Sequence, residues 1–79
     1  MGKVSYKEFK NAVYKKYLAR MKDYDQDEVK EYFNSEEAIQ EIHNAYEYNS
    51  KRLEDGKLSE AVFIGDAANS VANCLAMMF

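Results

Sequence analysis

The sequence predicts an all-α domain: a compact bundle of three long helices and one short helix, in which neighbouring helices are mostly antiparallel. The chain of 79 residues has no proline and only three glycines, whereas an all-β domain would use many more turn residues. Apolar residues recur at three- and four-residue spacing. A serine or aspartate stands before each such stretch, where helix N-caps are preferred. The stretches are joined by short segments, which favours antiparallel neighbours.

The first helix is predicted over residues 5 to about 21. Ser5 is placed to act as its N-cap, and Glu8, three residues later, would complete a capping box. Basic residues gather in the last turns, where the helix dipole favours positive charge. The apolar stripe of this helix comprises Tyr6, Phe9, Ala12, Val13 and Tyr17.

A short second helix is predicted to follow Asp25, which with Glu28 would form another capping box, and to end at Phe33. Ser35 would cap a third helix from 36 to about 54, although the two helices could also be continuous. Gly56 is placed for a left-handed C-terminal cap. The apolar face of the third helix comprises Ala38, Ile39, Ile42, Ala45, Tyr46, Asn49 and Leu53.

Ser59 is predicted to cap a fourth helix from 60 to about 77. Its apolar stripe comprises Ile64, Ala68, Val71, Ala72 and Leu75. Residues 61–79 contain no lysine or arginine, so their composition resembles a membrane span. A polar stripe makes that costly in a bilayer, and we therefore interpret the segment as a buried core helix. This stripe comprises Asp66, Asn69, Ser70 and Asn73.

The length predicts one domain, residues 1–79, with a small core. Cys74 is the only cysteine, so no disulfide can form within the chain. The first residues lack the apolar run of a secretory signal, and we expect a cytoplasmic protein without a membrane partner. Charge is segregated: residues 1–22 carry seven bases and one acid, and residues 23–60 carry twelve acids and four bases. Such segregation can steer partners.

The only pattern that suggests a metal ligand set is Asp23, Asp25 and Asp27, which resembles the start of a calcium-binding EF-hand loop. The sixth position requires glycine and is Glu28, and the twelfth requires a bidentate glutamate and is Asn34. An acidic cap for the next helix is the favoured interpretation. We expect no metal and no cofactor.

A catalytic set is also not evident. His43 has no second ligand or nucleophile at a suitable spacing, and Cys74 has no basic neighbour that would lower its pKa. A pair between His43 and Cys74 remains open at this stage. Because an acid, a base and a nucleophile cannot be assembled from these residues, we expect a protein that is not an enzyme.

The basic first helix is a candidate for nucleic-acid binding, since lysines can contact phosphates and tyrosine can stack on bases. The chain is acidic overall, with a net charge of −3, and has no recognisable recognition helix. A solvated face is therefore favoured, and nucleic acid is the less favoured partner. The candidate contacts are Lys7, Tyr14, Lys15, Lys16 and Lys22.

The favoured hypothesis is a protein-interaction module that self-associates as a homodimer through the C-terminal helix. Phenylalanine, methionine and tyrosine are enriched at interfaces, and a second copy would enlarge a small core. Tyr14, Tyr24 and Tyr48 are predicted to point outward. The alternative is that the bundle wraps these side chains into its own core. The candidate interaction residues are Phe63, Met77, Met78 and Phe79.

Overall fold

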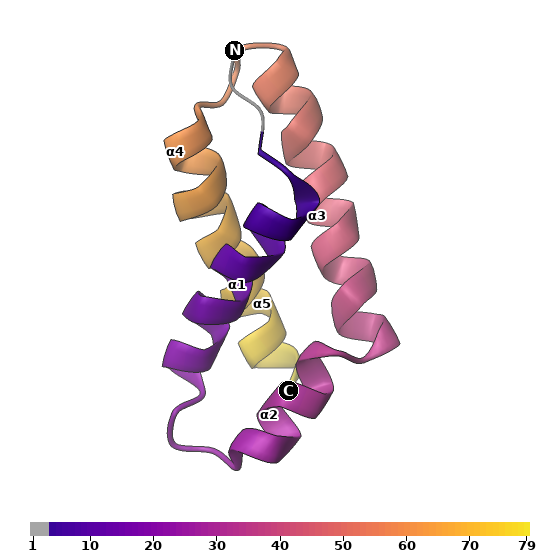
Figure 1. The fold of residues 1–79 in the computed structure, drawn as a ribbon, viewed down its shortest axis with the longest axis vertical. Helices are drawn as coiled ribbons and strands as arrows, with labels where there is room; N and C mark the ends of the chain where they lie inside the picture. Colours follow the sequence, from indigo (N-terminus) through magenta and orange to yellow (C-terminus); the bar gives the residue numbers. More distant parts are fainter. Residues whose placement is uncertain (1–3) are drawn as a thin grey trace.

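The computed structural model describes residues 4–79, and every regular element in this part of the chain is a helix (Figure 1). Helix α1 spans Tyr6–Arg20, α2 spans Gln26–Phe33 and α3 spans Glu36–Glu54. The segments α4 (Glu60–Val62), η1 (Phe63–Ala67) and α5 (Ala68–Met78) follow one another without a break and form the C-terminal helix, Glu60–Met78. The predicted all-α class is confirmed.

Local capping chemistry determines where the helices begin. The four predicted N-caps, Ser5, Asp25, Ser35 and Ser59, all accept hydrogen bonds from backbone N–H groups of the first turn. Ser5 and Glu8 form the full capping box, with distances of 3.1 and 3.2 Å. In the second predicted capping box, the Asp25 side chain accepts from the backbone of α2, but the Glu28 side chain does not accept from the Asp25 N–H. Asn34 and Ser35 separate α2 from α3, so these helices are not continuous.

The end of α3 depends on Gly56. Its φ of +75° is in the left-handed region, which glycine adopts without steric cost. Its N–H donates to the Leu53 carbonyl, and the N–H of Lys57 donates to the Arg52 carbonyl over 2.9 Å. These two bonds make a Schellman motif, which satisfies the last carbonyls of α3 and confirms the predicted cap.

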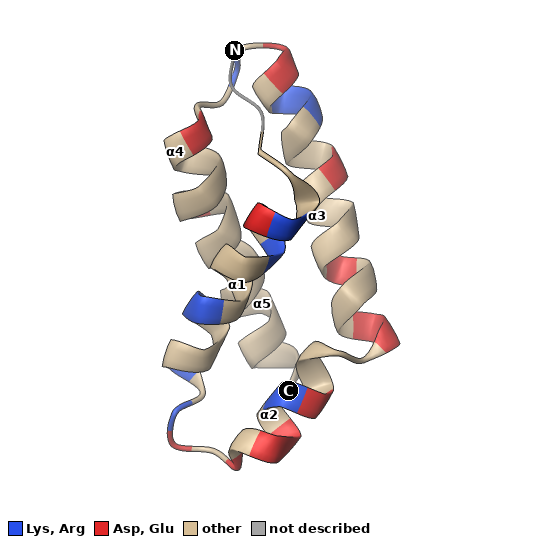
Figure 2. Cartoon of the chain, viewed as in Figure 1, with Lys and Arg blue, Asp and Glu red and all other residues tan. Residues whose placement is uncertain are grey.

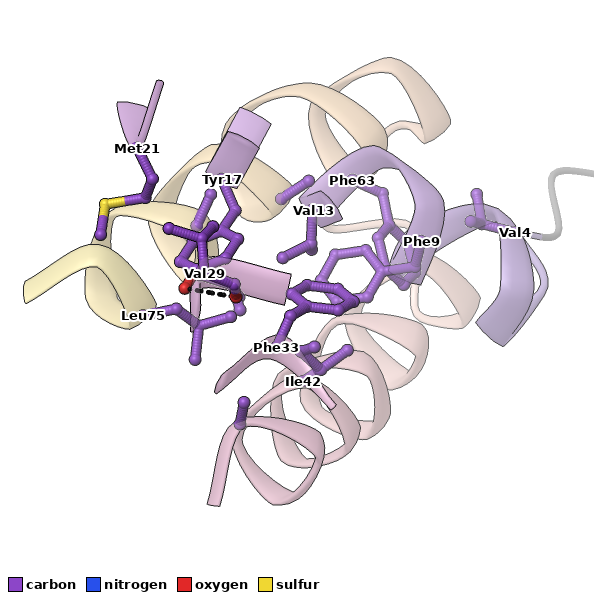
Figure 3. Packing of buried hydrophobic residues seen from close by; sticks show 14 residues of the cluster. Val4, Phe9, Val13, Tyr17, Met21, Val29, Phe33, Ile42, Phe63 and Leu75 are labelled. Carbon is purple, nitrogen blue, oxygen red and sulfur yellow. Dashed lines mark hydrogen bonds between the residues drawn. The ribbon is translucent and has the colours of Figure 1, made fainter. Parts of the chain in front are cut away.

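Helix α1 lies across the C-terminal helix, and the contact between α1 and α5 is the most extensive in the fold (Figure 1). The α3 helix runs beside the C-terminal helix in the opposite direction. Phe9 packs edge-on against Phe63, with ring centroids 5.0 Å apart (Figure 3). The Tyr17 hydroxyl donates to the Val29 carbonyl over 3.1 Å, which fixes α2 against α1 without leaving a buried polar group unpaired.

A π-type turn interrupts the C-terminal helix. The Ala68 N–H donates to the Phe63 carbonyl, five residues earlier, so that this turn holds one residue more than an α-helical turn. As a result Phe63 joins Ala68, Ala72 and Leu75 in the core, while Ile64 is only half buried. The prediction that placed Ile64 in the stripe and left Phe63 outside it was wrong, because it assumed regular α-helical spacing.

Two further side chains differ from their predicted positions. Ile39 was expected in the core, but it lies at the edge of the apolar face of α3 and is exposed. Tyr14 was expected on the surface, but its ring packs against Phe33 with centroids 4.6 Å apart. Tyr24 and Tyr48 are exposed, as predicted.

The C-terminal helix is also less enclosed than a buried core helix. Among the described residues it is the one helix long and apolar enough to cross a membrane, a criterion that core helices of soluble proteins also meet. Only 28% of its most apolar stretch is buried. Its polar stripe of Asp66, Asn69, Ser70 and Asn73 is exposed, as expected. The helix therefore has one side in the core and a second, partly apolar side at the surface.

Replacing Gly56 with alanine should destabilise the fold by about 1 kcal/mol, because a Cβ is unfavourable at positive φ. Gly65→Ala is the matched control: it has open space for a Cβ and no positive φ, so it should stabilise by about 0.5 kcal/mol. Urea unfolding midpoints would measure both. Equal effects of the two substitutions would contradict the role assigned to the left-handed cap.

Candidate functional site

Exposed apolar side chains gather where the C-terminal helix ends beside α2. We call Tyr24, Met77, Met78 and Phe79 the C-terminal patch; Met77 is 80% exposed and Met78 39%. The Phe79 ring meets the rings of Tyr24 and Tyr32 edge-on, with centroids 5.7 Å apart in both pairs. Phe63, the fourth residue predicted for this surface, is fully buried and does not belong to it. The other three predicted residues are exposed at the end of the C-terminal helix.

Tyr32 forms the inner wall of the C-terminal patch. Its hydroxyl donates to Glu37 Oε1 over 3.0 Å. Burial raises the pKa of Tyr32 to about 12, and the hydrogen bond to Glu37 and the negative charge of that carboxylate act in the same direction. The phenol is therefore held neutral and oriented by α3.

Acidic side chains border the patch. Glu28 and Glu31 of α2 line an open hollow of about 450 Å³ together with Tyr32, Ser35 and Phe79. Asp23, Asp25 and Asp27 lie in the adjoining loop and first turn, and all three are exposed. The patch thus combines an apolar centre with a negative border.

A second surface runs along the molecule between α3 and the C-terminal helix. This α3 groove has a volume of about 590 Å³. Its rim carries Glu41, Tyr48, Arg52 and Asp66, and the Arg52 guanidinium lies 5.6 Å from the centre of the Tyr48 ring. Its floor contains small and apolar side chains together with the buried Asn49: Ala45, Asn49, Leu58, Val62, Ala67, Val71 and Cys74. Asn44 and Ser70 complete the lining.

The α3 groove leads into the C-terminal patch through Cys74. The Cys74 Sγ lies 3.8 Å from Glu41 Oε1 and 3.7 Å from Met78 Sδ. Apolar side chains therefore recur on this side of the molecule from Leu58, just before the C-terminal helix, to Met78, with Asp66 and Ser70 between them. Periodicity alone missed this groove, since Glu41 and Tyr48 belong to the polar face of α3. The available signal was the four-, three- and four-residue spacing of Glu41, Ala45, Tyr48 and Arg52.

The structure does not bring His43 and Cys74 together. His43 is exposed, with its Nε2 3.5 Å from Glu47 Oε1 and its ring against Tyr6. Cys74 is half buried rather than fully buried. Burial raises the pKa of the Cys74 thiol, and the Glu41 carboxylate raises it further by its charge and its hydrogen bond. This environment disfavours the reactive thiolate.

The acidic loop acts as a helix cap in the structure. Asp25 Oδ1 accepts from the N–H groups of Asp27 and Glu28, at 2.9 and 3.3 Å. Within residues 4–79 no three histidine, cysteine or acidic side chains are grouped so that they could hold a metal ion. The three aspartates considered as calcium ligands are therefore not assembled into a ligand set.

The basic side of the molecule is formed by α1 and the loop after it (Figure 2). Lys7, Lys15 and Lys22 are exposed, and Lys16 is half buried. Among residues 4–79 the one close contact between a basic side chain and a carboxylate joins His43 to Glu47, so these lysines do not pair with the acidic residues of α2 and α3. Tyr14 is half buried, with its ring packed at a tilt against Phe33, and contributes little open ring surface. The candidate nucleic-acid face is therefore a set of unpaired lysines.

In comparisons with protein families, curated proteins and solved structures, no family model, curated protein or solved structure matches this chain.

The raised pKa of Tyr32 predicts a pH dependence of stability. Above pH 10 the unfolded chain loses the phenolic proton before the folded chain does, so the contribution of Tyr32 is complete below pH 10 and is lost by about pH 12. The difference in unfolding free energy between the wild type and Tyr32→Phe should shrink across this window in urea titrations. Glu37→Gln removes the acceptor charge and should move the loss to lower pH. A difference that is independent of pH would contradict the assignment.

Proposed function

We propose that the protein is a non-enzymatic interaction module that self-associates through its C-terminal helix. The observation that carries this proposal is the apolar surface which that helix leaves exposed, including Met77 at 80% exposure and Met78 beside it. Contiguous exposed apolar side chains on a small domain mark a binding surface. Methionine suits such a surface because its unbranched side chain adapts to the partner.

The size of the domain supports a second copy as the partner. A chain of this length buries a modest share of its surface on folding, so an additional apolar interface contributes to stability. The molecule is elongated, at 40 × 21 × 18 Å, and its exposed apolar side chains follow the long axis. Lateral pairing of two copies would cover this side of both.

The surroundings of the patch favour protein over lipid as its partner. Glu28 and Glu31 border the patch, and no lysine or arginine lies in residues 61–79. An anionic membrane surface attracts basic segments and is repelled by acidic ones. The cytoplasm remains the predicted location, and the proposal involves no catalytic step and no cofactor.

Substituting Met77 and Met78 together with glutamine should weaken self-association at least tenfold, since each side chain buried at an interface contributes about 1.5 kcal/mol or more. Glutamine keeps helix propensity similar to that of methionine. Sedimentation equilibrium over a wide concentration range would measure the dissociation constants.

Ile39→Gln is the matched control, because Ile39 is exposed on α3 outside both surfaces and its substitution should leave the dissociation constant unchanged. Truncation from Leu75 is unsuitable, since Leu75 is fully buried and its loss would damage the core. A wild-type protein that stays monomeric at hundreds of micromolar would overturn self-association.

Nucleic-acid binding is the second candidate function, and the unpaired lysines of α1 favour it. An isolated basic face attracts phosphates through counterion release, which makes binding strongly dependent on salt. The negative potential of α2 and α3 opposes this attraction, which is why we rank this function second.

If the basic face binds nucleic acid, Lys15→Ala and Lys22→Ala should each weaken binding to a short oligonucleotide at low salt and reduce the salt dependence by about one phosphate contact. Lys51→Ala, an exposed change on α3, is the control and should have a smaller effect. Fluorescence anisotropy at several salt concentrations would measure both. Absence of binding to DNA and RNA at low salt would end this candidate.

A further inference from the structure

One stripe of α3 has the spacing of a helix–helix contact. Glu41, Ala45, Tyr48 and Arg52 all line the α3 groove and follow one another at intervals of four, three and four residues. Intervals of three and four are those of the contact line between two packed helices, because such residues lie on one side of the helix. The stripe extends for about 16 Å along the axis of α3.

From its first residue to its last, this stripe carries an acid, a small residue, a large residue and a base. When the same series is laid against itself in the opposite direction, the acid faces the base and the small residue faces the large one. When a second α3 runs antiparallel across the midpoint of the stripe, Glu41 faces Arg52 of the second copy, and Ala45 faces Tyr48 of the second copy. Two-fold symmetry repeats both contacts. The exposed Tyr48 ring then packs over the smallest residue of the stripe.

In a parallel alignment of two α3 helices the facing side chains are not complementary. It brings Glu41 against Glu41 and Arg52 against Arg52, and it sets the two Tyr48 rings against each other. Like charges that face each other are destabilising, whereas opposite charges at the same positions favour one orientation. The stripe therefore selects the antiparallel arrangement.

The C-terminal helix agrees with the same arrangement. Cys74 lies beside Glu41, and Val62, about 18 Å further along the helix, lines the same groove as Arg52. The groove side of this helix is apolar at both ends, with Val62, and Leu58 just before the helix, at one end and Met78 at the other. Antiparallel pairing sets Met78 of one copy opposite Leu58 and Val62 of the second. Ala67 and Ser70 lie near the midpoint and permit close approach of the two helices, with the exposed Asp66 beside them on the rim.

We propose that the α3 groove is the contact face of a two-fold, antiparallel dimer of this chain, with Glu41 and Arg52 as the residues that determine its orientation. The inference deepens the self-association proposed above and rests on it. The Arg52 guanidinium already lies over the Tyr48 ring, so both side chains are held along the rim before the second copy arrives.

Charge reversal provides the test. Glu41→Lys places two lysines against the Arg52 residues, and Arg52→Glu places two glutamates against the Glu41 residues, so each variant alone should self-associate at least tenfold more weakly than the wild type. An equimolar mixture of the two variants restores both opposite-charge pairs. It should therefore form a mixed dimer with affinity close to that of the wild type, as measured by sedimentation equilibrium.

The matched controls are Glu47→Lys and Lys51→Glu, which make the same charge changes on exposed positions of α3 outside the groove. They should leave self-association unchanged, alone or mixed. Far-UV circular dichroism would confirm that each variant is folded. Recovery in the mixture cannot arise from misfolding, because each chain keeps its own substitution.

The outcomes separate the two proposals. A monomeric wild type would overturn self-association and this dimer together. A dimeric wild type whose reversed variants remain dimeric, or whose mixture fails to recover, would overturn the α3 groove as the contact face and leave self-association through the C-terminal patch standing.

Discussion

The π-type turn at Phe63–Ala67 determines which side chains of the C-terminal helix reach the core and which reach the surface. One additional residue in a turn rotates everything before it by roughly 100° relative to everything after it. Phe63 consequently enters the core against Phe9, and Ala67 lies on the floor of the α3 groove. Burial of the Phe63 side chain stabilises the fold by roughly 1.5–3 kcal/mol, which offsets the poorer hydrogen-bond geometry of the turn.

The same turn leaves the C-terminal helix with two apolar sides. One side packs under α1, where Ala68 and Ala72 are small enough to let the two helices approach closely. The other side faces the α3 groove and is covered only at its edge by α3. The helices α1, α2, α3 and the C-terminal helix all contribute to one core, and the groove lies where no helix covers the seam between α3 and the C-terminal helix. This is a general consequence of building a bundle from few helices, because each helix then lacks neighbours on part of its circumference.

Most local features of the fold were predictable because neighbouring residues determine them. The N-caps at Ser5, Ser35 and Ser59 and the glycine cap at Gly56 depend on short-range hydrogen bonds, and their positions fixed the helix ends. Features that depend on tertiary packing were missed. The spacing of apolar residues does not reveal the π-type turn, so Phe63 was predicted to lie at the surface. The α3 groove was missed because periodicity separates apolar from polar faces, and its rim consists of polar residues of α3.

Because basic and acidic residues are separated along the chain, the two proposed binding surfaces lie on different helices. Helix α1 carries one acid, Glu8, and several lysines, so two copies of its basic face would repel each other (Figure 2). The stripe of α3 carries one acid and one base at opposite ends, so it attracts its own reverse. In the proposed dimer both α1 faces would lie outside the contact, because no residue of α1 lines the α3 groove. A dimer of this kind would present two basic faces to any anionic partner, and binding that partner would not require the dimer to open.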